Sequence, residues 1–157
     1  MASTITSANL KVKITEEIIL NGKDRGSSNT LTIGSINEIS TRIVTVTTTE
    51  AEILKFHATD IDAGRYIIGD VRYMRFTNLD DTNFITLTFT NEDSDEVAIK
   101  LDAGQSFIWN GDNSGGLVDV FNATEAAGVA STLGNLENIQ ADADSDSCDL
   151  EMLIASV

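Results

Sequence analysis

A chain of 157 residues with 41% hydrophobic side chains can bury the core of one domain without disulfides or bound metal. Its formal net charge of −15 disfavours nucleic acid and anionic membrane surfaces as partners, because both are bound chiefly through Lys and Arg. The single cysteine, Cys148, excludes an internal disulfide, and the absence of proline fits a chain rich in paired strands.

The charge is distributed unevenly along the chain. Residues 1–100 carry 15 acidic and 10 basic side chains, whereas residues 101–157 carry 10 acidic and no basic ones. Solubility through self-repulsion is the simplest interpretation. A cationic partner surface, divalent cations and a high-salt setting are the alternatives.

The polar start M-A-S-T-I-T-S lacks a secretory signal, and no run of 18 apolar residues follows. We therefore expect a protein made in the cytoplasm, with no membrane-spanning segment. The small polar residues 1–8 predict a flexible N-terminal arm, and residues 9–157 a single β-sandwich domain.

The first third of the chain predicts strands joined by tight turns. Alternation at Leu10, Val12 and Ile14 predicts a first strand. Asn21-Gly22 predicts a tight turn, and the polar residues 23–29 a mobile loop. Gly34-Ser35 breaks the alternation and predicts a bulge or strand end. Strands are predicted over 42–48 and 50–56, the second with a short helical turn as the alternative. A turn at 60–64 precedes residues 65–68.

The stretch from Val71 to Trp109 predicts a β-meander. In its middle strand Ile85, Leu87 and Phe89 alternate with threonines, which is typical of a half-buried antiparallel strand. The phrase Phe-Thr-Asn-x-Asp occurs at 76–80 and again at 89–93, so we expect successive hairpins to use the same exit.

The last third is predicted less uniformly. Residues 110–116 are glycine-rich and predict a flexible loop. Residues 118–121 favour a strand, and the alanine-rich residues 123–130 either a short helix or an extended loop. Two strands, over 136–143 and 149–157, close the chain around a polar turn, with Leu150, Met152 and Ile154 on one face. Turn signals every eight to twelve residues predict an all-β fold, an antiparallel β-sandwich or jelly roll with about ten short strands, with a twisted barrel as the competitor.

Catalytic motifs are scarce. As a catalytic base, His57 would need a nucleophile, but the chain contains no Gly-x-Ser-x-Gly motif. The acidic neighbours of Cys148 would raise the pKa of its thiol. The paired carboxylates at 80–81, 92–93 and 95–96 fall in predicted links between strands, where acids favour turns. We therefore expect no enzyme activity and no cofactor.

The one candidate metal site follows the spacing Asp142-x-Asp144-x-Asp146-x-x-Asp149. Its start resembles a calcium-binding loop, but Ser147 takes the glycine position and Leu153 the position of the bidentate glutamate. A solvated acidic turn is the favoured interpretation, with a calcium or magnesium site as the alternative.

Aromatic residues are the remaining candidates for a binding site. Trp109 lies at a strand end beside a glycine-rich loop, Phe107 precedes it, and Tyr73 falls opposite Met74 and Phe76, a position that favours exposure. Together with Tyr66 they could form a sugar-binding platform, but core or subunit packing is the favoured interpretation.

The phrases R-Y-M-R-F-T-N-L-D (72–80), I-T-L-T-F (85–89) and L-D-A-G-Q-S-F (101–107) resemble those of small virion structural proteins of tailed bacteriophages, especially marine and cyanobacterial ones. The ending, from Ile139 to Ile154, has the same character. The resemblance covers residues 70–110 and 136–157 and contains no diagnostic motif.

The resemblance implies a β-sandwich in a symmetric homo-oligomer, with a trimer favoured, on a virion made in the host cytoplasm. Its partner would be the major capsid protein or another virion protein, and its role would be decoration or cementing of the head. The alternatives are tail or fibre anchoring, or a carbohydrate- or receptor-binding module. No catalytic residue is carried over.

Overall fold

The computed structural model describes residues 4–59, 64–111, 114–123 and 133–157. None of these residues lies in a helix, so none forms a helix long and apolar enough to cross a membrane. The described residues form the strands β1 (Ala8–Glu16), β2 (Ile19–Leu20), β3 (Lys23–Asp24), β4 (Ser27–Ile36), β5 (Glu38–Val46), β6 (Ala51–His57), β7 (Arg65–Ile67), β8 (Val71–Asn78), β9 (Ile85–Asn91), β10 (Glu96–Leu101), β11 (Ser106–Asn110), β12 (Leu136–Ala143) and β13 (Cys148–Ser156).

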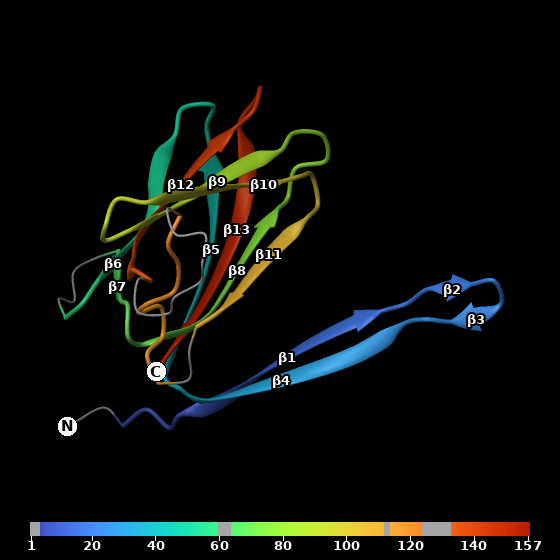
Figure 1. The fold of residues 1–157 in the computed structure, drawn as a ribbon, viewed down its shortest axis with the longest axis horizontal. Coiled ribbons are helices and arrows are strands. Elements are labelled where there is room, and N and C mark those ends of the chain that lie inside the picture. Colours follow the sequence, from blue (N-terminus) through green and yellow to red (C-terminus); the bar gives the residue numbers. More distant parts are fainter. Residues whose placement is uncertain (1–3, 60–63, 112–113, 124–132) are drawn as a thin grey trace.

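Two sheets pack face to face as a sandwich (Figure 1). One has the strand order β11-β8-β13-β5 and the other β10-β9-β12-β6-β7. Successive antiparallel pairs lie in the two sheets by turns: β5–β13 and β8–β11 in the four-stranded sheet, β6–β12 and β9–β10 in the other. The same arrangement results when one long hairpin is wound around a barrel. This is the winding of a jelly roll, with the parallel edge strand β7 added. The predicted fold class is confirmed.

The core lies between the two sheets and is built from the inward residues of both. Alternation along β13 places Leu150, Met152 and Ile154 in it, as the sequence predicted. The opposite sheet supplies Leu87 and Ile139, which are fully buried. Removing these side chains from water is the main force that holds the sheets together.

The predicted meander is wrong. β8 belongs to one sheet, whereas β9 and β10 belong to the other, so only β9 and β10 form a hairpin. The link over 79–84 therefore crosses between the sheets. Alternation reports that a strand has one buried face, and this condition is met equally well in either sheet of a sandwich.

The repeated Phe-Thr-Asn-x-Asp phrase marks two strand ends with the same local structure. Asn78 and Asn91 are both fully buried, and each accepts a hydrogen bond at Oδ1 from the backbone nitrogen two residues later, that of Asp80 or Asp93, at 3.0 Å. The prediction that both phrases open hairpins is wrong for the first of them. The same local structure leads to a crossover after Asn78 and to a hairpin after Asn91.

Residues 8–36 form a long hairpin, β1 with β4, that leaves the sandwich and ends in the small β2–β3 hairpin (Figure 1). Asn21 and Gly22 turn the chain with φ of 52° and 72°, the positive angles of the predicted tight turn. The bulge predicted at Gly34-Ser35 is present, since Ser35 has φ 61° and the register shifts there.

The mobile loop predicted over 23–29 is wrong. β3 begins at Lys23, and β4 begins at Ser27, which pairs with Glu16. The polar composition arises because both faces of this part of the hairpin are exposed, so its sequence resembles that of a loop. The strand predicted over 50–56 is present as β6, Ala51–His57, and the alternative of a helical turn is wrong. Four other predictions fall partly outside the described residues: the N-terminal arm, the turn at 60–64, the glycine-rich loop and the alanine-rich segment. The residues concerned are 1–3, 60–63, 112–113 and 124–130.

Candidate functional site

The β1–β4 hairpin is a two-sided ribbon. The pairs Leu10–Ile33 and Val12–Leu31, followed by Ile14, line one face, whereas lysines and threonines line the other. A free two-stranded ribbon is at best marginally stable in water. Its stability must therefore come from a surface that covers the apolar face.

The sandwich covers only the near half of this face. Ile33 and Ile36 are buried against Tyr73 and Ala155 on the outer face of the four-stranded sheet, and Leu10 packs beside them. Farther out, Ile14 is 45% exposed and Leu31 is 37% exposed. The apolar face thus continues beyond the body without cover in the described part of the chain.

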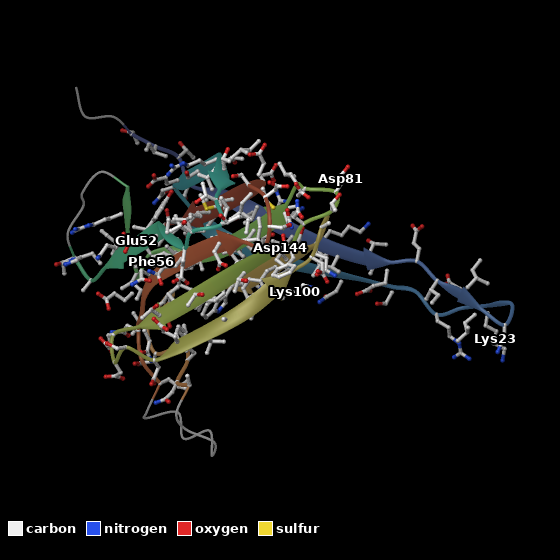
Figure 2. The ribbon with its side chains drawn as sticks, turned by 90° about the horizontal axis from the view of Figure 1, so that it is seen from above. Lys23, Glu52, Phe56, Asp81, Lys100 and Asp144 are labelled. Carbon is white, nitrogen blue, oxygen red and sulfur yellow. The ribbon has the colours of Figure 1, made fainter. Side chains whose placement is uncertain are left out.

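The tip of the hairpin is also apolar. Ile18, Ile19 and Leu20 directly precede the tight turn and are all exposed, Ile19 by 77%. Lys23 and Arg25 follow, and Figure 2 shows Lys23 far from the sandwich. Exposed apolar residues gathered in this way mark contact surfaces more often than do single exposed ones.

A second exposed apolar patch lies on β5, at the edge of the four-stranded sheet. Ile39 and Ile43 point to the outer face and are each 58% exposed. Ile39 pairs with Ala155, which the hairpin base covers, so the patch adjoins the covered area. We call these two residues the β5 patch.

The position of Tyr73 corrects one prediction. Tyr73 is only 5% exposed because the hairpin base covers the outer face of β8 there, so the first four residues of β8 are all buried. This burial raises the pKa of the Tyr73 hydroxyl, and the Arg75 charge opposes the rise in part. Tyr73 is therefore a packing residue between hairpin and sheet.

Trp109 and Phe107 come together, as a shared site requires. With Val97, Ile99 and Phe121 they line an apolar groove of about 190 Å³ between the edge strands β10 and β11. The Trp109 ring packs edge-on against Phe89 at 5.2 Å between centroids and is half-buried. This groove is the second candidate site, and its two rings, partly buried, pack against the core.

The four candidate metal ligands do not gather. Asp142 lies in β12, Asp144 and Asp146 in the turn, and Asp149 accepts a hydrogen bond from Thr45 at 2.9 Å. Burial and the nearby Glu50 raise the pKa of Asp142. Residues 4–59, 64–111, 114–123 and 133–157 contain no group of three His, Cys, Asp or Glu side chains arranged to hold an ion.

Cys148 and His57 lie apart, at the start of β13 and the end of β6. Burial raises the pKa of the Cys148 thiol, and Asp80 with the acids of the 144–149 turn raises it further, as predicted. His57 accepts a hydrogen bond from the Thr59 backbone nitrogen at 3.4 Å.

Comparison with known proteins does not assign the chain to a family. No protein-family model and no curated protein matches it. A similar solved structure is that of Bacillus endospore appendages, which form a family of disulfide-linked pili; it is 10% identical, covers 100% of this chain and 95% of the other, and superimposes with a TM-score of 0.39. Similarity at this level carries no conclusion about function.

Sequence analysis missed the hairpin as a candidate site, although two signals were present. The apolar run Ile18–Leu20 stands directly before a tight turn, where hairpins of a folded body usually place polar residues. In addition, Lys11 and Lys13 alternate with the apolar residues of β1, which marks a ribbon with one wet face. Neither signal indicates which part of the apolar face stays exposed in the folded protein.

Proposed function

We propose that this chain is a non-enzymatic structural protein of a tailed-phage virion that decorates or cements the head as a homo-oligomer. The observation that carries the proposal is the projecting hairpin with its uncovered apolar face, because such an extension is suited to reach a neighbouring subunit. The jelly-roll winding is compatible with the role, since viral coat proteins often use it, as do lectins. The sequence resemblance supports the same assignment.

Immunogold labelling of virions tests this function. Antibodies raised against the purified protein should label the heads of phage particles released from the host in which the chain is produced. Gold confined to tails would favour the alternative of tail or fibre anchoring over head decoration. Particles left unlabelled at saturating antibody, with the denatured virion proteins also unreactive on a blot, would contradict a virion role.

The aromatic groove favours a second candidate, a carbohydrate- or receptor-binding module. It is concave and apolar, and it contains the only tryptophan in the chain. Glycan-binding sites are built on such rings, although here Trp109 contacts other rings edge-on and is half-buried.

Titration with glycans should then shift the fluorescence emission of Trp109, because a bound sugar displaces water from the ring. The variant Val97→Glu places a charge at the groove and should abolish the shift while leaving Trp109 in place. A library of glycans that leaves the emission unchanged would remove this candidate and leave the groove as part of the packing.

A further inference from the structure

The far half of the hairpin is an apolar surface that requires an occupant. Its near half is covered by the outer face of the chain's own four-stranded sheet, and the apolar side continues past that contact through Leu31 and Ile14. The contact with the sandwich identifies the kind of surface that fits this face. It is an exposed sheet face that carries aliphatic side chains.

The outer face of the same sheet has one part that meets this description and is still exposed. The β5 patch, Ile39 and Ile43, borders the area that the hairpin base covers. β5 is also an edge strand, nine residues long and without proline, and its only charged side chains are Glu38 and Arg42. An edge strand has no neighbouring strand on one side, so a second copy can approach the patch from that side.

Charge also favours a second copy as the occupant. Residues 1–36 carry four basic and three acidic side chains, whereas residues 37–157 carry six basic and 22 acidic ones. The hairpin is thus the part of the chain that an acidic body does not repel. Its far half, residues 14–31, is close to neutral, because Lys23 and Arg25 are offset by the acids Glu16, Glu17 and Asp24.

We propose that the far half of the hairpin of one copy packs its apolar face, at Ile14 and Leu31, on the β5 patch of a second copy. This inference rests on the homo-oligomer of the proposed function and names its interface. The donating and accepting surfaces are different, so every copy can both donate and accept. Such an interface closes into a ring or extends into a filament, depending on the rotation between copies.

Light scattering of the full-length protein tests the inference without any virion. Wild type should form an oligomer. The donor variant Ile14→Ser/Leu31→Ser and the acceptor variant Ile39→Ser/Ile43→Ser should each remain monomeric at concentrations about tenfold or more above those at which wild type assembles. Leu79→Ser, which changes an apolar residue 47% exposed in a loop of the sandwich, is the matched control and should assemble like wild type.

Mixing separates the proposed pairing from a general loss of assembly. The donor variant keeps its β5 patch and the acceptor variant keeps its hairpin, so the two should form a mixed complex although neither assembles alone. Copies with Leu31→Cys and copies with Ile43→Cys should form a disulfide-linked dimer on oxidation, whereas Leu31→Cys mixed with Val97→Cys should not. Cys148 is buried and does not compete.

A monomeric wild type, or variants that assemble as wild type does, would overturn the inference. So would variants that fail to mix or to cross-link, since the hairpin would then have another occupant, such as a different virion protein. The outcome is independent of immunogold labelling. If the protein is an oligomer but antibodies label no particle, this interface stands and the virion role is removed. If virions are labelled but the protein is a monomer, the virion role stands and this interface is removed.

Discussion

Replacing Phe76 by alanine is expected to lower the free energy of unfolding by about 3–5 kcal/mol. Phe76 lies on the inner face of β8, is fully buried, and meets Phe89 of the opposite sheet edge-on at 6.4 Å between ring centroids. Alanine would leave a cavity between the two sheets where both contribute contacts. Because strands of both sheets line this position, neither sheet can fill the space without moving the other.

Chemical denaturation of the variant and wild type measures this loss. Phe107→Ala is the matched control, because Phe107 is the cross-strand partner of Phe76 on the edge strand β11 and is only half-buried. It should cost clearly less, since part of its ring is already in water. If Phe76→Ala and Phe107→Ala lowered the free energy of unfolding equally, the core would not be centred between β8 and β9.

Replacing Asn78 by leucine is expected to cost about 2–5 kcal/mol of unfolding free energy, although leucine is apolar and similar in size. The Asn78 side chain is fully buried where the chain crosses between sheets. Its Nδ2 donates to the carbonyl oxygens of Asn83 at 2.8 Å and Leu101 at 3.1 Å, and its Oδ1 accepts from Asp80. Leucine would remove all three hydrogen bonds and leave buried backbone groups without these partners.

Thermal and denaturant unfolding of Asn78→Leu, with Asn37→Leu as the control, tests this expectation. Asn37 is exposed between β4 and β5, so the same change there should alter stability by less than about 0.5 kcal/mol. Asn91→Leu should behave like Asn78→Leu, because Asn91 is buried at the equivalent strand end. A tolerated Asn78→Leu would mean that the crossover is held by the backbone alone.

Local sequence predicted the strands well and their partners poorly. Alternation correctly located β9 and β13 and their inward residues, because pleating fixes which side chains share a face. The assignment of β8 and β9 to one sheet failed, because the choice of sheet depends on contacts between distant segments. β8 pairs with β13, which begins 70 residues after it ends.

Tyr73 and the 23–29 segment illustrate the same limit in opposite directions. Tyr73 occupies the outward side of β8 and was expected to be exposed, but a hairpin far away in sequence covers it. Ser27, Ser28 and Asn29 have the composition of a loop, yet they belong to a strand because β1 pairs with them. Whether a residue is buried or paired depends on two segments, its own and the one that meets it. The sequence pattern of one segment carries no information about the other.

The candidate sites divide in the same way. Phe107 and Trp109 were identified from their position near a strand end, and the fold brings them to one groove together with Phe121. At 142–149 a metal site was the alternative to a solvated acidic turn, and the described residues contain no group of three side chains arranged to hold an ion there. The hairpin was found only when the structure showed which part of its apolar face the sandwich leaves exposed.

By itself the sequence determined the all-β class, the tight turn at Asn21-Gly22, the bulge at Gly34-Ser35 and the acidic character of the body. These features follow from period-two alternation, backbone angles and charge, which act over a few residues or over the whole composition. Only the tertiary structure decided the jelly-roll winding, the burial of Tyr73 and the half-covered hairpin. Each of these depends on which distant surfaces meet, and that is set by the free energy of the packed whole.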